Sequence, residues 1–278
     1  MNNIFLWCFS PFVEYLFMRR ALVACMAIVL SSAPLGVILI QRRLSLMGEA
    51  LSHGTLPGIA IAYLVVGMWL PALTLGGALA GLCVVMFSHF IAKRTILEED
   101  ASFSSFYMIA LALGVLILSL KEGSIRLVHL LFGSVLAVDA PSLLFMALVS
   151  TVTILILMVI YRPLIYECFD PQFMQSLRLP SGVYNFIFLS LVVANLVAAY
   201  QALGTLMALG IMMVPAVTAR LLSKRLTHIF LASIILALLA SYVGLVFSYH
   251  FNWPSGPTII LVAGCFYILA ILYTLGRG

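Results

Sequence analysis

Two side chains with metal-binding chemistry, Glu49 and His53, lie inside an otherwise apolar stretch of this sequence, residues 41–67. They are four residues apart, so on a helix both would lie on one face. If that helix starts near Arg43, His53 lies ten residues in. That is roughly 15 Å along the axis, about half of a ~30 Å hydrocarbon core. An isolated carboxylate at this depth costs on the order of several kcal/mol, so the pair indicates a functional site. Its carboxylate and imidazole suit a borderline divalent metal such as Zn, Mn or Fe.

A structural interpretation of the same pair stays open. A neutral Glu49 hydrogen-bonded to His53 would hold helices together without binding any metal. One carboxylate and one imidazole are also too few ligands for a tight, closed metal site. The pair suits a transporter better, because a transported metal must leave its ligands as well as reach them.

The composition is that of a membrane protein. Only 8% of the 278 residues are charged and 64% are hydrophobic, whereas a soluble domain carries roughly 25% charged residues. The net charge of +5 does not indicate nucleic-acid binding, because the basic residues are scattered at the ends of apolar segments, as the positive-inside rule produces. We therefore expect lipid, and no nucleic acid, around this chain.

Stretches without Asp, Glu, Lys or Arg predict the membrane spans. Three hold 20 to 22 residues, enough for one helix each, and three hold 41 to 51, enough for two. In chain order these stretches are 21–41, 50–92, 101–120, 140–161, 179–219 and 226–276. Turns inside the long stretches are expected at residues 69–71, 201–204 and 250–257. The pattern predicts an all-α, polytopic helical bundle of about nine spans, within a range of eight to ten, forming a single transmembrane domain over residues 1–278.

The ends of the spans indicate the orientation. With Arg42 and Arg43 in the cytoplasm, ten basic residues lie on that side and four on the other, which places the N-terminus outside and the C-terminus inside. The N-terminal segment, residues 1–18, contains Pro11 and Glu14 and is predicted to lie at the membrane interface.

Small residues and prolines inside the spans predict contacts and kinks. Gly77 and Gly81 are four residues apart, a spacing that favours close helix contact in membranes. Pro57 follows His53 by four residues and would bend the helix beside the candidate site, because it lacks a backbone donor.

The longest polar connection, residues 161–182, predicts a short helix on the cytoplasmic face. Asp170 followed by Pro171 is typical of a helix start. An amphipathic helix over residues 172–179 would follow. Such a helix suits docking to a partner protein, and an ordinary linker helix is equally compatible with the residues.

The sequence resembles the permease subunit of bacterial ABC importers for divalent metals, the zinc, manganese and iron group of the ABC-3 type. The segment Arg42–Gly58 matches the family pattern R-R-x-S-x-x-G-D-A-x-S-H-x-x-L-P-G, with Glu49 where the family usually has Asp. Further matches follow in family order at residues 130–133, 136–138, 169–171, 214–222 and 254–259. Together they cover residues 19 to about 275.

This resemblance implies a type II-like importer permease in the bacterial cytoplasmic (inner) membrane. It implies a homodimer, two copies of a separate cytoplasmic ABC ATPase and an extracytoplasmic metal-binding receptor. The family's metal pair maps onto Glu49 and His53. The polar connection over residues 161–182 would then contain a coupling helix that docks into the ATPase through Phe169, Asp170, Pro171, Gln175 and Leu179. Glu49 reaches one methylene further than Asp, and Met174 and Arg178 stand where Ala and Gly are common.

We therefore expect an ATP-driven importer subunit, not an enzyme, that binds no permanent cofactor and passes manganese, zinc or iron through a cavity at the dimer axis. The chain has no G-x-x-x-x-G-K-[ST] loop to hold ATP and no H-E-x-x-H protease motif. Two rival interpretations are a proton-coupled secondary transporter and a membrane scaffold that transports nothing. The scaffold would tolerate Leu at both positions of the pair. Leu56 and Pro57 after the histidine resemble the manganese and iron branch of the family.

Overall fold

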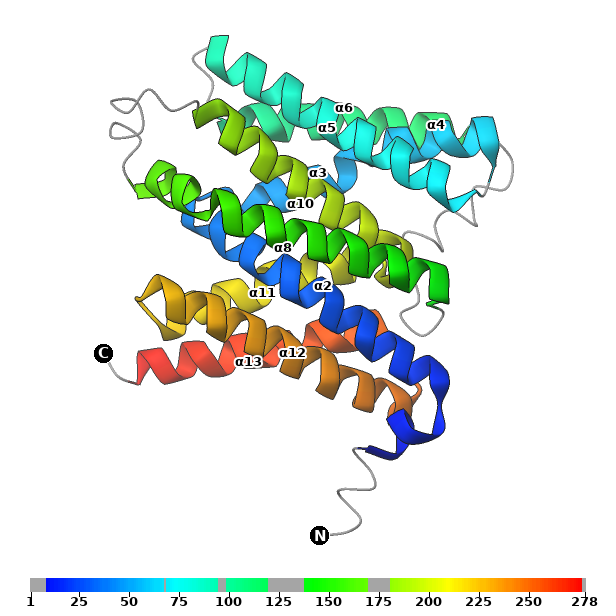
Figure 1. Ribbon diagram of the computed structural model, residues 1–278, viewed down its shortest axis with the longest axis vertical. Helices are drawn as coiled ribbons and strands as arrows, with labels where there is room; N and C mark the ends of the chain where they lie inside the picture. The colour runs from blue at the N-terminus through cyan, green and yellow to red at the C-terminus, as the bar shows by residue number, and fades with distance from the viewer. Residues whose placement is uncertain (1–8, 68, 95–98, 120–137, 170–180, 277–278) are drawn as a thin grey trace. The chain divides into compact units, whose positions relative to one another are not determined.

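The structure is a computed structural model that describes residues 9–67, 69–94, 99–119, 138–169 and 181–276. Within these ranges the regular elements are all helices (Figure 1). They are α2 (Leu16–Gln41), α3 (Ser45–Gly54), α4 (Leu56–Val66), α5 (Leu70–Arg94), α6 (Glu99–Ser119), α8 (Ala140–Phe169), α10 (Ser181–Leu203), α11 (Thr205–Leu222), α12 (Leu226–Phe251) and α13 (Ser255–Leu275). Residues 9–14 form a further short helical segment.

Eight helices in the described residues are long and apolar enough to cross a membrane. In this count α3 and α4 together supply one span, Met47–Val66, and α6 contributes a shorter apolar helix, Ser102–Ile117. The all-α prediction and the predicted range of eight to ten spans are therefore confirmed for the part of the chain that is described.

The predicted turns fall where the helices end. The chain leaves helical structure between α4 and α5, between α10 and α11 at Gly204, and between α12 and α13. Gly204 has a φ of 84° and Asn252 a φ of 52°. These left-handed values suit glycine and asparagine better than other residues, which explains why the turns form there.

Two helix boundaries differ from the sequence expectation. Helix α2 begins at Leu16, so the last residues of the segment predicted to lie at the interface are already part of the first long helix. Helix α8 continues through Pro163 to Phe169, so the first nine residues of the predicted loop, 161–169, are helical. Interior prolines are tolerated in apolar helices when the freed backbone groups find other partners.

The described residues group into two compact units. Unit 1 takes its residues from 1–40, 128–150 and 199–278, and unit 2 from 41–127 and 151–198. Helices α8 and α10 each contribute residues to both units.

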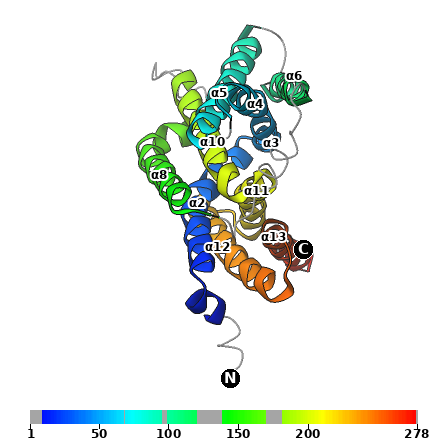
Figure 2. The ribbon, with the colours of Figure 1, turned by 90° about the vertical axis from the view of Figure 1, so that its right-hand side faces the viewer.

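Unit 1 is built from α2, α11, α12 and α13. Val37 and Ile40 of α2 pack with Ala216 and Ala219 of α11 and Ile229 of α12 in one buried cluster. Helices α11, α12 and α13 lie side by side in both views (Figures 1 and 2). Small residues keep these helices close, since membrane helices gain little from hydrophobic burial and associate through tight backbone packing.

Unit 2 contains the stretch that carries Glu49 and His53. Helix α4 crosses α5 at Gly58 and Gly76, where a Cβ added to either glycine would collide with the other's carbonyl oxygen. The predicted contact at Gly77 and Gly81 is confirmed. A Cβ on Gly77 would lie 3.0 Å from Ile59 of α4, and one on Gly81 would lie 2.7 Å from Val193 of α10.

Candidate metal site

Glu49 and His53 both lie on α3, a helix of only ten residues. This helix starts at Ser45, two residues after the start expected near Arg43. His53 is therefore about 12 Å along the helix at 1.5 Å per residue. The predicted spacing on one helix face is confirmed. Whether the pair holds a metal stays a prediction.

The span is interrupted just after His53. Helix α3 ends at Gly54, Thr55 links the two helices, and α4 begins at Leu56 with Pro57 in its first turn. Proline fits the first turn of a helix, because its missing N–H has no partner there in any case. The predicted bend is therefore a change from one helix to the next. Interrupted spans are the usual way in which membrane transporters place ion sites inside the bilayer.

Helices α5 and α6 pack closely against this interruption, through contacts of Gly54 in α3 and Gly114 in α6. Gly54 lies beside Val84 of α5, where an added Cβ would be 3.3 Å from a valine methyl. An added Cβ on Gly114 of α6 would be 3.1 Å from Leu56 and from the Pro57 nitrogen. Two side-chain hydroxyls donate hydrogen bonds to nearby backbone carbonyls. The Ser52 hydroxyl donates to the backbone carbonyl oxygen of Glu49, and the Thr55 hydroxyl to that of Ser52, each at 2.8 Å. The interruption is therefore locally well packed.

The two candidate ligands differ in exposure. In the single chain the Glu49 side chain is exposed and that of His53 is half-buried. The imidazole stacks on Tyr107 of α6, with ring centroids 6.3 Å apart and an interplanar angle of 29°. His53 also lies in the last turn of α3, where the negative end of the helix dipole favours a cation. Tyr107 was not identified from the sequence, because nothing in a lone tyrosine of an apolar helix indicates which residue it faces.

Within the described ranges, no group of three or more His, Cys, Asp or Glu side chains is placed to hold a metal ion. A single chain thus brings two candidate ligands to this place, Glu49 and His53. A metal held here would keep water or take further ligands from another molecule, which suits passage better than storage.

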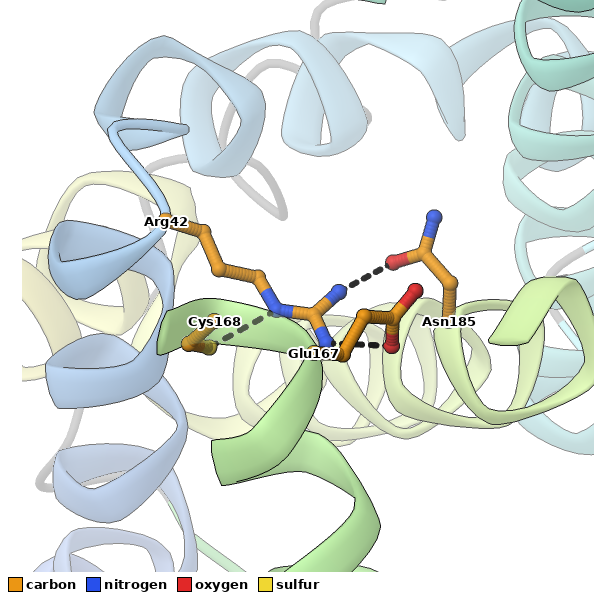
Figure 3. Close-up of polar contacts among 4 residues, drawn as sticks. All are labelled: Arg42, Glu167, Cys168 and Asn185. Carbon is orange, nitrogen blue, oxygen red and sulfur yellow. Dashed lines mark hydrogen bonds and ion pairs between the residues drawn. The ribbon is translucent and has the colours of Figure 1, made fainter. Parts of the chain in front are cut away.

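The second polar feature of unit 2 is a buried arginine just before α3. Arg42 donates from Nη2 to Glu167 Oε2 at 2.8 Å. It also donates from Nη1 to Asn185 Oδ1 at 2.5 Å. Its Nε donates to Cys168 Sγ at 3.3 Å. Figure 3 shows these three side chains around the guanidinium, which also lies 5.2 Å from the centroid of the Phe188 ring.

This ion pair is shielded from solvent. The Arg42 side chain is 8% exposed and that of Glu167 is 18% exposed. Removing one member of a buried pair costs about 3–5 kcal/mol, because the other charge is left without its partner. From the sequence, Arg42 indicates the orientation and opens the family pattern, and no contact with Glu167 or Asn185 is predicted. They are separated from Arg42 by 125 and 143 residues, so no local pattern connects them.

The cluster supports one part of the predicted topology. It joins the end of α2, the end of α8 and the start of α10, all inside unit 2. These are the helix ends that the charge distribution assigns to the cytoplasmic side. Of the predicted ATPase contacts, Phe169 ends α8. The side chain of Phe169 and residues Asp170, Pro171, Gln175 and Leu179 lie outside the described part of the structure.

The match to a protein family covers nearly the whole chain. The model of the ABC 3 transport family matches residues 14–274. The chain belongs to this family. With its apolar helices, membership identifies it as a multi-pass protein of the bacterial inner membrane.

Named relatives of the chain are membrane proteins of metal transport systems. It is 30% identical to the manganese import system permease protein ScaB of Streptococcus parasanguinis, over 92% of this chain and 90% of the relative. It is 27% identical to a probable iron transport system membrane protein of Haemophilus influenzae, over 98% of each chain. Among solved structures, PsaBC from Streptococcus pneumoniae in complex with Fab is similar, with a TM-score of 0.82, 26% identity and coverage of 97% of this chain and 95% of that one.

Proposed function

We propose that this chain is the permease subunit of an ATP-driven importer of divalent transition-metal ions, and that manganese or iron is its cargo. Family membership over residues 14–274 supports the transport class. The named relatives are a manganese import system permease protein and a probable iron transport system membrane protein. Zinc, which the resemblance also allows, has no support from these relatives.

The observation that carries the proposal is the placement of Glu49 and His53. They share one face of a short helix that ends inside a span, beside the helix interruption at Thr55. The carboxylate supplies charge and a hard oxygen, and the imidazole supplies the nitrogen that Mn²⁺ and Fe²⁺ also accept. The exposed Glu49 would face a passage lined by a second copy of the chain. Two such pairs at a dimer axis would give four protein ligands.

In this mechanism the metal is released by an outer receptor and held briefly by Glu49 and His53. It is then released inward when a separate cytoplasmic ATPase changes the arrangement of the permease. Protons compete for the same carboxylate and imidazole, so metal affinity falls as the pH is lowered. We assign ATP hydrolysis to the partner, since the sequence has no phosphate-binding loop of its own.

The test is metal uptake by cells that express this chain with its ATPase and receptor. Wild type, Glu49→Ala and His53→Ala are compared for uptake of Mn, Fe and Zn, at equal amounts of permease in the membrane. We expect wild type to accumulate manganese or iron and each variant to lose at least ten-fold in uptake. Chemical cross-linking of the purified permease checks for the second copy.

Two results would contradict the proposal. Normal uptake by both variants would make Glu49 and His53 packing residues. Uptake that persists without the ATPase, and that follows the proton gradient, would instead favour a proton-coupled secondary transporter.

A further inference from the structure

Arg42 joins three helix ends that are far apart in the sequence. It lies in the link of three residues between α2 and α3. Through its guanidinium it binds Glu167, in the last turn of α8, and Asn185, in the second turn of α10. The start of the helix that carries the candidate metal ligands is thus fixed directly to two other helices of unit 2.

We propose that Arg42 is a positioning residue for transport, which passes movement of the α8 and α10 ends to α3 and so to Glu49 and His53. The inference rests on the proposed function, because it gives Arg42 a part in the passage of metal. It goes further by assigning a mechanical role to a residue that lies seven positions before Glu49.

The contact geometry suits transmission of movement. The guanidinium is planar and uses three different nitrogens toward three side chains, and the Phe188 ring lies against it. A planar group fixed at several points cannot rotate away when one partner moves. In the low dielectric of this buried place the ion pair is also stronger than at a surface. Displacement of the α8 end would therefore take Arg42 with it.

The link over residues 42–44 and helix α3, which follows it, are suited to receive such a displacement. Arg43 has a φ of 60°, a left-handed conformation that is unfavourable for a residue with a side chain and that persists only where its surroundings hold it. Helix α3 has ten residues and ends at the interruption before α4. A movement at its first turn can thus turn Glu49 and His53 without moving the whole span.

Arg42 differs in this respect from arginines that only fix topology. An anchoring arginine keeps its charged head in water, as do Arg43 and Arg94, which are exposed. The Arg94 guanidinium lies 4.6 Å from the Phe90 ring on its own helix. The charge of Arg42 is instead directed into the protein, toward an acid and an amide.

The experiment uses the complete transporter, with its ATPase and receptor, in proteoliposomes with Mn²⁺ as the cargo. The quantity measured is Mn²⁺ imported per ATP hydrolysed, together with Mn²⁺ bound per permease and the melting temperature. The variants are Arg42→Lys, which keeps the charge and loses the planar guanidinium with its several donors, and Glu167→Gln, which keeps the size and loses the charge. Glu167→Asp restores the negative charge that Glu167→Gln lacks. Arg94→Gln is the matched control, because it removes an arginine that is exposed.

We expect Mn²⁺ imported per ATP to fall at least ten-fold in Arg42→Lys and in Glu167→Gln. Mn²⁺ binding and ATP hydrolysis should stay within about two-fold of wild type. Glu167→Asp should recover part of the loss, and Arg94→Gln should behave as wild type. If Glu167→Gln does not reach the membrane, Asn185→Ala weakens the same cluster while leaving the ion pair, and an intermediate loss is expected.

The inference is overturned if the cluster variants import as much Mn²⁺ per ATP as wild type. It is also overturned if import falls only in proportion to the amount of folded permease. In both cases wild-type import shows that the proposed function itself holds. If wild type imports no Mn²⁺ or Fe²⁺ while its ATPase is active, the proposed function fails, and the role of Arg42 fails with it.

Discussion

Glu49 differs by one methylene from the aspartate that the family pattern has at this position. On α3 the carboxylate can therefore reach further from the helix axis than an aspartate would. His53 is held more firmly, because its ring stacks on Tyr107 of α6. The adjustable member of the pair is thus the carboxylate, and metal preference should depend on its length as well as on its charge.

The variants Glu49→Asp and Glu49→Gln separate length from charge. Glu49→Asp should keep uptake within a few-fold of wild type and change the preference between Mn²⁺ and Zn²⁺. Glu49→Gln should lose at least ten-fold in uptake, because it removes the charge that attracts the cation. Competition between the two metals in an uptake assay measures both effects. Wild-type uptake by Glu49→Gln would show that the carboxylate is no ligand.

Asp139 stabilises the start of α8 in a way that depends on pH. Its Oδ1 accepts a hydrogen bond from the backbone N–H of Ser142 at 3.3 Å. Hydrogen bonding from the Ser142 side chain, and then from backbone groups and the charge of Arg20, holds the pKa of Asp139 below its usual value. A lowered folded pKa means that this stabilisation is complete above the unfolded pKa, about 4. It is lost as the pH falls through the folded pKa.

We expect Asp139→Ala to lower stability at pH 7 by about 0.5–1 kcal/mol, the low end for loss of a helix cap, because the side chain is exposed. The difference from wild type should shrink toward zero as the pH falls through the lowered folded pKa of Asp139, where the wild-type carboxylate becomes protonated. Thermal melting in detergent at several pH values measures this. A difference that does not change with pH would show that the charge of Asp139 contributes nothing.

At the scale of elements, the interruption between α3 and α4 is what places the candidate ligands. Pro57 prevents one continuous ladder of backbone hydrogen bonds, and the hydroxyls of Ser52 and Thr55 bind carbonyls beside the break. Backbone contact between Gly58 and Gly76 then fixes α4 against α5. The position of the break thus depends on packing as well as on proline.

Gly58→Ala tests this contact. An added Cβ would collide with the Gly76 oxygen and lie 2.7 Å from the Ala80 Cβ, so stability should fall by about 1–3 kcal/mol, as expected for overpacking. Gly264→Ala is the matched control, because a Cβ there meets nothing within 4 Å. It should be neutral or stabilise by up to about 1 kcal/mol through helix propensity. The melting temperatures of the two variants in detergent are compared with that of wild type. Equal melting temperatures of Gly58→Ala and wild type would refute the close approach of Gly58 to Gly76.

At the scale of the whole molecule, the charge distribution and the helix ends predict one orientation in the membrane. Arg42, Glu167 and Asn185 come together from three helix ends, as they must if α2 and α8 end on the side where α10 begins. The turn between α12 and α13 is predicted to lie on the opposite, outer side.

Labelling of single cysteines tests the orientation. In a variant without native cysteines, Trp253→Cys and Arg43→Cys each introduce one thiol at an exposed position. We expect a membrane-impermeant maleimide added to intact cells to label Trp253→Cys and to spare Arg43→Cys. Permeabilised cells, where both should react, provide the control. The reverse pattern would invert the orientation and place the candidate metal ligands on a path from the other side.

The sequence by itself determined the membrane class, the range of span numbers, the three predicted turns and the helical spacing of Glu49 and His53. These depend on local properties: hydrophobic length, turn residues and helical spacing. Tertiary structure alone decided that Gly58 meets Gly76, that His53 stacks on Tyr107, and that Arg42 binds Glu167 and Asn185. The physical reason is that these contacts join residues far apart in the sequence, and their stability comes from packing and burial that no single stretch of residues contains.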